Sequence, residues 1–277
     1  MVTTDAQIHV WEVDRPDRPW PREQRGTPQL PNGFSAKQAI TAMDAAAVDR
    51  AVLVPPSWIG ENNATALEAA AGYPTRFAVM GRIDPTAAGL SEQLATWLQQ
   101  PHMLGIRLTL HYPPMSNWLA DGSLDLFWRE CARFDIPVMA FVPGAPGSLA
   151  AVAAANPDLR LILDHMAVPL GLHGAQAFAQ LDDLLALAAD GNVSVKVSAV
   201  PCYSAEPYPY RDVQPYLRRI YEAFGPRRLL WGSDLTRLPG SYSECADLFR
   251  NELDFLSADD RAWIMGKAAA AVMGWPE

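Results

Sequence analysis

The amino-acid sequence predicts a (β/α)8 TIM barrel, formed by one domain over residues 1–277 with extra helices at its C-terminal end. Eight short apolar segments alternate with helical patterns along the chain, as parallel strands and their covering helices do. The length of 277 residues is close to the roughly 250 that such a barrel uses. No glycine-rich phosphate turn follows the first strand, which disfavours an open doubly wound sheet.

The first predicted strand covers residues 5–11 and ends in polar side chains. Alternation along a strand places Asp5, Gln7 and His9 on one face and the apolar residues 6, 8 and 10 on the other. An imidazole beside a carboxamide is unusual for pure packing. We therefore expect the C-terminal end of this strand to lie in an active site.

The other strands and helices are predicted from apolar runs and from helical spacing of apolar residues. The strands are expected at residues 51–54, 77–81, 104–110, 137–142, 159–163, 193–198 and 229–231. The helices are expected at residues 35–47, 63–71, 90–99, 123–134, 148–155, 177–188, 213–224, 244–253, 258–264 and 267–273. Two long loops, 11–34 and 201–212, follow strands, so we expect both on the catalytic face of the barrel. Within the second loop, the proline-rich residues 201–210 are a candidate for a lid over the site or for a fixed wall beside it.

Composition narrows the classes of partner and the cellular setting. The net charge of −9 argues against nucleic acid and anionic membrane as main partners, but it does not exclude a small anionic substrate. Cys131, Cys202 and Cys245 form no CxxC pair, which fits a reduced, cytoplasmic setting. Neither a signal peptide nor an apolar run of about 20 residues is visible. The helical surface leaves room for a homodimer.

Polar residues gather where the predicted strands end, and these ends converge in a barrel. They are Gln7, His9, Arg82, Arg107, His165, Lys196 and Asp234. Each has an ordinary structural interpretation when taken alone: an Asp after Gly-Ser caps a turn, and a single His at a strand end is commonly structural, as we expect for His111 and His173. The convergent set of His9, His165 and Asp234 is predicted to be functional.

Three motifs, in order along the chain, resemble the amidohydrolase superfamily. They are Asp-Ala-Gln-Ile-His-Val-Trp at 5–11, Leu-Asp-His-Met at 163–166 and Trp-Gly-Ser-Asp at 231–234, and the late Met-Gly-Lys-Ala at 265–268 extends the similarity over nearly the whole chain. The likeness is to the amidohydrolase-2 branch, which includes pyrone-dicarboxylate and sugar lactonases. The resemblance implies a (β/α)8 fold and hydrolysis, or occasionally decarboxylation, at the C-terminal ends of the strands.

The sequence departs from the family pattern at its metal-ligand positions. The first His of the usual His-x-His motif is Gln7, the fifth strand has no His, and the fourth offers Arg107 in place of a bridging Lys or Glu. A binuclear centre is therefore not expected, and we predict no tightly bound metal. A single zinc ion, if present, would have His9, His165 and Asp234 as ligands, with an open fourth position.

We hypothesise hydrolysis of a small carboxylated lactone or a related ester. Asp234 acts as general base on water, His9 and His165 polarise the carbonyl and orient the water, and Gln7 donates a hydrogen bond to the same oxygen. Substrate-binding residues are expected to be cationic, for the carboxylate, or aromatic, for the ring. They are Arg107, Lys196, Arg82, Trp11, Tyr203 and Trp58.

Two alternatives stay open at this point. A non-oxidative decarboxylase of a small aromatic carboxylic acid fits the same resemblance, with Arg107 holding the departing carboxylate. A barrel that binds a ligand without turnover is favoured by Gln7 and by the missing His on the fifth strand. The three retained residues His9, His165 and Asp234 oppose that alternative, since a purely binding barrel does not need them all.

Overall fold

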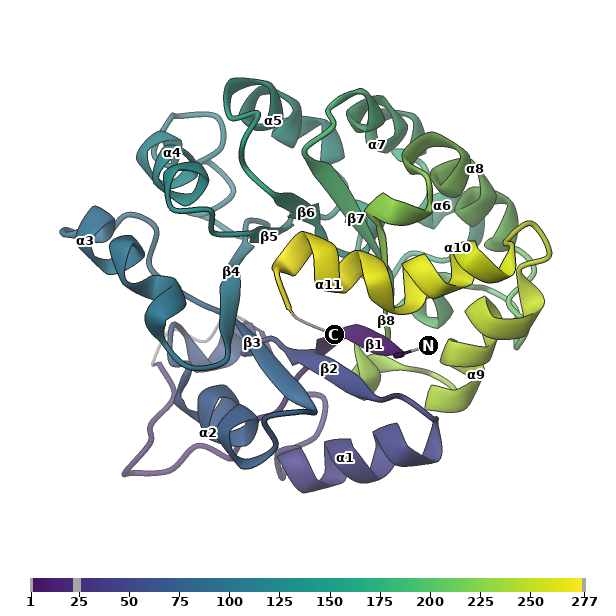
Figure 1. Ribbon diagram of the computed structural model, residues 1–277, viewed down its shortest axis with the longest axis horizontal. Coiled ribbons are helices and arrows are strands. Elements are labelled where there is room, and N and C mark those ends of the chain that lie inside the picture. The colour runs from purple at the N-terminus through teal and green to yellow at the C-terminus, as the bar shows by residue number, and fades with distance from the viewer. Residues whose placement is uncertain (1, 22–25, 276–277) are drawn as a thin grey trace.

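The computed structural model of the chain describes residues 2–21 and 26–275. In this part, eight strands form one sheet in the order β1 to β8, and each consecutive pair is parallel. The strands are β1 Thr4–Ile8, β2 Arg50–Leu53, β3 Phe77–Gly81, β4 Met103–Thr109, β5 Val138–Phe141, β6 Leu161–Leu163, β7 Val193–Ser198 and β8 Leu229–Gly232. The sheet curls until β8 lies beside β1 (Figure 1), which confirms the predicted (β/α)8 barrel.

Helices surround the barrel and cover the outer face of the sheet (Figure 1). They are α1 Ala36–Ala45, α2 Ala64–Gly72, α3 Leu90–Ala95, α4 Asp125–Arg133, α5 Ala150–Ala155, α6 Gly174–Ala177, α7 Leu181–Ala186, α8 Gln214–Phe224, α9 Tyr242–Asp247, α10 Ala258–Ala262 and α11 Ala268–Met273. The predicted helix 177–188 is divided between α6 and α7, and the predicted helix 244–253 continues past α9 as a π turn over Leu248–Glu252. The extra C-terminal helices are α10 and α11.

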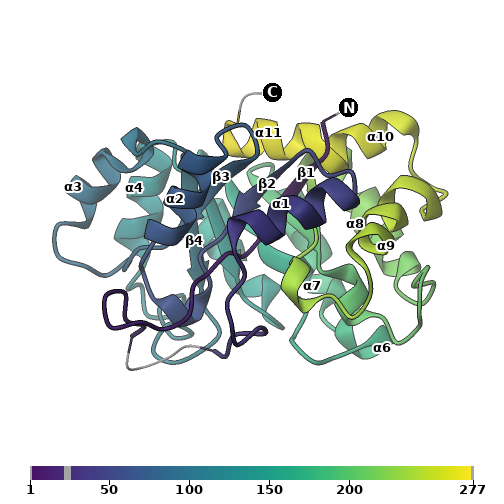
Figure 2. The ribbon, with the colours of Figure 1, turned by 90° about the horizontal axis from the view of Figure 1, so that it is seen from below.

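The last helix, α11, closes one end of the barrel. Its residues Ala268 and Met273 pack into a buried cluster with interior side chains of the strands, among them Met80, Met139 and Leu230. Figure 2 shows α11 on the opposite side of the molecule from the loops that follow the strands. Because α11 covers the N-terminal ends of the strands, the open end of the barrel is the one where the strands finish.

Strand β1 does not follow the predicted alternation. Its pairing with β2 is irregular between Asp5 and Ile8, as in a β-bulge. Ala6 therefore packs in the interior cluster, whereas Ile8 packs in the outer core. The prediction that Asp5 shares a face with Gln7 is wrong, because Asp5 contacts Tyr242 of α9 outside the barrel while Gln7 points into it.

The buried carboxylate of Asp5 joins β1 to β8. Its Oδ1 accepts hydrogen bonds from the backbone N–H of Gln7 at 2.8 Å and of Ser233 at 2.9 Å. Its Oδ2 accepts the hydroxyl of Tyr242 at 2.6 Å. Next to it, the N–H of Asp234 donates to the carbonyl of Gln7 at 2.9 Å. Burial, opposed by these hydrogen bonds, raises the pKa of Asp5 to about 6.

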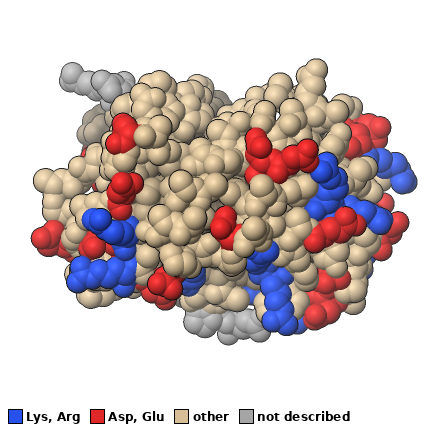
Figure 3. Space-filling model, turned by 90° about the horizontal axis from the view of Figure 1, so that it is seen from above, with Lys and Arg blue, Asp and Glu red and all other residues tan. Residues whose placement is uncertain are grey.

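The surface carries interleaved charges rather than one continuous patch of either sign on the face in Figure 3. Exposed ion pairs include Arg219 with Asp182 at 2.6 Å and Arg218 with Asp254 at 2.9 Å. Such pairs contribute about 1 kcal/mol or less each, so the fold depends on its buried layers. Within the described residues, no helix is both long and apolar enough to cross a membrane.

The raised pKa of Asp5 predicts a pH-dependent difference in stability between the protein and Asp5→Asn. The folded state holds the Asp5 proton up to about pH 6, whereas the unfolded chain loses it near the ordinary aspartate pKa of 3.8. Stability is therefore lost as pH rises through this window. We expect the free energy of unfolding of the wild type, minus that of Asp5→Asn, to fall by about 3 kcal/mol between pH 3.5 and 7.

Urea unfolding at several pH values measures this difference. Asp254→Asn is the matched control, because Asp254 is 86% exposed and its ion pair with Arg218 is at the surface. The difference in free energy of unfolding between the wild type and Asp254→Asn should stay constant with pH within error. A difference for Asp5→Asn that is flat, or that grows with pH, would contradict the interpretation.

Candidate active site

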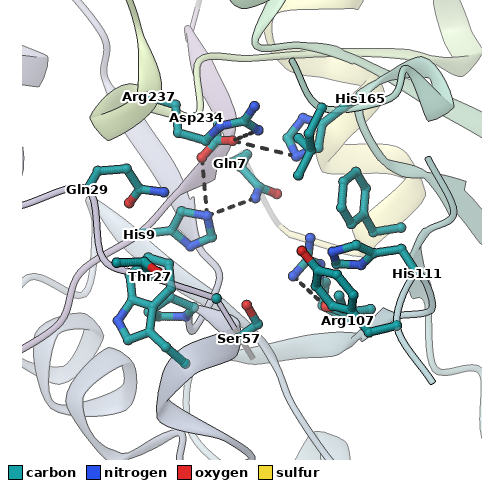
Figure 4. A pocket seen from close by; sticks show the side chains of 17 residues that line it. Gln7, His9, Thr27, Gln29, Ser57, Arg107, His111, His165, Asp234 and Arg237 are labelled. Atoms are coloured by element: carbon teal, nitrogen blue, oxygen red, sulfur yellow. Dashed lines mark hydrogen bonds and ion pairs between the residues drawn. The ribbon is translucent and has the colours of Figure 1, made fainter. Parts of the chain in front are cut away.

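A cavity of about 210 Å³ opens at the C-terminal ends of the strands (Figure 4). Six of the predicted site residues line it: Gln7, His9, Trp58, Arg107, His165 and Asp234. They come from five places in the barrel, after or near the ends of β1, β2, β4, β6 and β8. The barrel thus brings together residues that are up to 227 positions apart, from Gln7 to Asp234.

Asp234 lies between the two histidines (Figure 4). Its Oδ1 is 3.1 Å from Nε2 of His9, and its Oδ2 is 3.7 Å from Nε2 of His165. The side chain of Asp234 is only 2% exposed, so these contacts act with little screening by water. The convergent set predicted from the sequence is therefore a physical cluster.

Two members of this cluster have backbone in the left-handed region. His165 has φ 51° and ψ 36°, and Asp234 has φ 54° and ψ 47°. Residues other than Gly seldom adopt this conformation, and it costs of order 1 kcal/mol. In both cases the strand has just ended, and the turn directs the side chain toward the cavity. Such strain at the ends of β6 and β8 is typical of a functional site.

The hydrogen bonds of His9 define which of its nitrogens carries the proton. Its Nδ1 lies 2.6 Å from the carbonyl of Val54, which only accepts, so Nδ1 carries a proton. Its Nε2 lies 3.2 Å from Nε2 of Gln7. In the neutral ring, Nε2 of His9 thus offers a lone pair that accepts the amide N–H of Gln7.

A buried network of charges lies directly behind Gln7. The ammonium of Lys196 donates to Oε1 of Gln7 and is 2.8 Å from Oδ1 of Asp164. Oδ2 of Asp164 accepts from Nε of Arg107 at 3.0 Å, and Nη1 of Arg107 donates to Thr109 at 2.7 Å. Burial would raise the pKa of Asp164, but Lys196 and Arg107 outweigh it and hold the pKa at about 2.

The protonation of the cluster follows from its surroundings. Burial would raise the pKa of Asp234, but the contact with His9 and the guanidinium of Arg237 hold it well below its usual range. Burial lowers the pKa of His165 to about 3, against the opposing charges of Asp234 and Asp164. At neutral pH the site therefore combines an ionised carboxylate with a neutral imidazole, whose Nδ1 lies 2.7 Å from the Ser198 hydroxyl.

Four other predicted substrate-binding residues lie elsewhere. Lys196 is fully buried beneath Gln7, and Arg82 lines a neighbouring cavity of about 180 Å³ with Arg107. Trp11 packs behind Trp58, with the ring centroids 5.3 Å apart, and Tyr203 is fully buried. Tyr203 belongs to the segment 201–210, and among the described residues none of that segment lines the 210 Å³ cavity. The placement of these side chains favours a packing role for the two aromatics and for this segment.

Arg237 is the main site residue that the sequence did not indicate. Its Nη1 donates to Oδ2 of Asp234 at 2.9 Å, and its side chain lines the cavity. Its spacing of three residues after Asp234, within one turn, was the available signal. His111, expected to be structural, also lines the cavity, and burial together with Arg107 and Arg82 lowers its pKa to about 4.

The donor set does not fit a zinc ion held by His9, His165 and Asp234. A ligand must direct a free lone pair at the metal, but Nε2 of His9 already faces the amide N–H of Gln7. Oδ2 of Asp234 accepts a hydrogen bond from the guanidinium of Arg237, which places a positive charge beside the oxygen that would have to bind the metal. Within residues 2–21 and 26–275, no group of at least three His, Cys, Asp or Glu side chains could hold a metal ion.

Comparison with known proteins covers almost the full chain. The model of the Amidohydrolase family matches residues 4–275. A protein named L-fucono-1,5-lactonase from Burkholderia ambifaria is 28% identical over 276 residues, which cover 95% of this chain and 92% of that protein. Another of the same name, from Burkholderia multivorans, is 26% identical over 292 residues, 99% of this chain and 96% of its own length.

The fold is also similar to solved structures. A crystal structure of an amidohydrolase from Burkholderia multivorans with bound zinc superposes with a TM-score of 0.83 and 25% identity, and the match covers 100% of both chains. The agreement supports the barrel architecture over its whole length. Together with the family model, it confirms the resemblance seen in the three sequence motifs.

The contact between Arg237 and Asp234 predicts the effect of Arg237→Met. Removing the guanidinium removes a positive charge that stabilises the ionised carboxylate, so the pKa of Asp234 should rise. Carbon-13 NMR of the aspartate side-chain carboxyls, recorded as a function of pH, measures the shift. Arg218→Met, which removes an exposed guanidinium paired with Asp254, should leave Asp234 unchanged. An unchanged or lowered pKa in Arg237→Met would contradict this electrostatic role.

Proposed function

The chain belongs to the amidohydrolase family, and from this premise we propose that it hydrolyses a small carboxylated lactone. The observation that carries the proposal is the ionised carboxylate of Asp234, held between two imidazoles at the wall of a small cavity. Water in that cavity can reach Asp234, and a carboxylate that is ionised at neutral pH can accept its proton. The two relatives named L-fucono-1,5-lactonase support a lactone as the substrate class.

The proposed reaction begins when Asp234 takes a proton from a water molecule. The water oxygen attacks the lactone carbonyl, and the tetrahedral oxyanion then expels the ring oxygen, which receives the proton. Asp234 holds this proton between the two steps, next to His9 at 3.1 Å. If the Ser198 hydroxyl donates to Nδ1 of His165, then Nε2–H of His165 is free to donate to the oxyanion. One such donor is worth about 3 kcal/mol.

The contacts of Gln7 support a different role from the one expected from the sequence. Its amide N–H is directed at His9 and its oxygen at Lys196, so its hydrogen-bonding groups are engaged within the protein. In this arrangement Gln7 orients His9 instead of polarising the substrate carbonyl directly. The carbonyl is left to His165, which lines the same cavity.

The carboxylate of the substrate is assigned to Arg107. Its Nε and Nη1 bind Asp164 and Thr109, but no described residue bonds its Nη2. A guanidinium whose Nη2 is not bonded to a described residue can donate to a carboxylate in the cavity. Trp58 and Phe141 line the same cavity, and they offer apolar contact to a ring.

Asp234→Asn tests the general base. The amide keeps the shape of the side chain but cannot accept the proton of water, so we expect kcat for lactone hydrolysis to fall by about 10²–10⁴-fold. The dissociation constant for the hydrolysed product, measured by calorimetry, should change only a few-fold. Asp182→Asn, at an 86% exposed position, is the control and should keep full activity. Retention of kcat in Asp234→Asn would eliminate this mechanism.

A matched pair of substrates tests the substrate class. We expect kcat/KM for a carboxylated six-membered lactone to exceed that for its methyl ester by at least about tenfold, because only the free acid pairs with Arg107. Arg107→Gln should reduce this preference while leaving hydrolysis of the ester less affected. L-fucono-1,5-lactone belongs in the same panel as a neutral comparison. Equal rates on the neutral lactones and the acid would contradict the carboxylate assignment.

A further inference from the structure

Lys196 is an unusual feature of the barrel interior, because it is a fully buried lysine without contact to the cavity. Its ammonium has three donors and three protein neighbours: Oε1 of Gln7, Oδ1 of Asp164 at 2.8 Å and the sulfur of Met139 at 3.4 Å. Burial lowers the pKa of Lys196, and the ionised carboxylate of Asp164 at 2.8 Å opposes this shift and keeps the proton on the lysine at neutral pH. A positive charge thus lies beneath the active site.

The charge on Lys196 fixes the orientation of Gln7. An ammonium donates hydrogen bonds and accepts none, so the atom of Gln7 that faces it must be the carbonyl oxygen. The amide nitrogen of Gln7 then faces Nε2 of His9 at 3.2 Å. Lys196 and the lone pair on Nε2 of His9 thus select the same orientation of the amide, and without Lys196 only His9 would select it among these contacts.

We infer that Lys196 and Gln7 together take the place of a metal ion in this site. The ammonium supplies a fixed positive charge, and the amide that it orients occupies the lone pair of His9 to which a metal ion would bind. Lys196 is therefore a positioning residue, which acts on His9 through Gln7. The catalytic part of this inference rests on the proposed function, whereas the part that concerns metal binding does not.

The surrounding charges support this assignment. Lys196 and Arg107 carry two positive charges against the single negative charge of Asp164, so the buried network beneath the cavity is cationic overall. A divalent cation placed between His9, His165 and Asp234 would be repelled by that network. It would also meet the N–H of Gln7 where it needs a ligand. Both effects oppose metal binding, and both depend on Lys196 or on Gln7.

Cobalt(II) titration tests the inference without any substrate, because a tetrahedral cobalt site has a visible absorption spectrum. We expect wild type to bind cobalt at this site only weakly. Gln7→His, which replaces the donor by a lone pair, should bind it, and Gln7→His with Lys196→Met should bind more tightly still. The double variant should exceed wild type by about 100-fold in affinity, the range associated with groups that orient a ligand. Lys267→Met, at an exposed lysine, is the control and should behave as wild type.

Several outcomes would overturn the inference. One is stoichiometric cobalt or zinc binding by wild type that is lost in His9→Ala. Another is equal affinity in wild type and in the folded double variant. If circular dichroism shows that the double variant does not fold, the single variant Gln7→His becomes the test. The inference is then wrong unless Gln7→His binds cobalt at least about tenfold more tightly than wild type. An absence of lactone hydrolysis would defeat the proposed function and leave the metal result unaffected.

Kinetics separate a positioning role from substrate binding. Lys196→Met should lower kcat at least about tenfold, because the amide of Gln7 and the ring of His9 lose their fixed orientation. KM should stay within about threefold, because Lys196 does not reach the cavity. Unchanged kcat, or a rise in KM alone, would overturn the positioning role. Lys267→Met again serves as the control.

Discussion

The structure depends on one buried chain of charges, from Arg107 through Asp164 to Lys196 and on to Gln7. Moving an ion out of water costs several kcal/mol, and removing one partner of a buried pair commonly costs about 3–5 kcal/mol. Here Asp164 has a cation at each oxygen, which offsets that cost. Because the four residues belong to β4, the end of β6, β7 and β1, the network fixes four strands relative to one another at the depth where the cavity begins.

Gln7 connects this network to the place where the barrel closes. Its side chain binds Lys196 and His9, its N–H binds Asp5, and its carbonyl accepts the N–H of Asp234. Gln7 thus fixes both the imidazole of His9 and the backbone of Asp234. The bulge in β1 makes this arrangement feasible, since it turns Asp5 outward to Tyr242 while Gln7 stays inside. The left-handed backbone of His165 and Asp234 is tolerated within this over-determined frame.

The sequence was sufficient for features that follow from periodicity and from strand ends. The (β/α)8 order and the cluster of His9, His165 and Asp234 follow from parallel strands that finish on one side. The outward turn of Asp5 was not accessible, because a bulge breaks alternation without a Gly or Pro to mark it. Lys196 could be placed on the inner face, but its depth below Gln7 depends on strand register, which a single sequence does not define.

The electrostatics of the cavity explain how a weakly basic carboxylate can serve in hydrolysis. Asp234 is held ionised by Arg237 and the contact with His9, which keeps it ready but makes it a poor final acceptor for a proton. The proton on Asp234 therefore passes on to the leaving ring oxygen of the lactone. The lone pair on Nε2 of His9 is occupied by the amide N–H of Gln7, while the carbonyl of Val54 holds the opposite side of the ring. Since Lys196 orients Gln7 and Gln7 orients His9, the wall of the cavity next to Asp234 is positioned from beneath the site. A lactone suits this arrangement, because its leaving alkoxide needs less assistance than the amine of an amide.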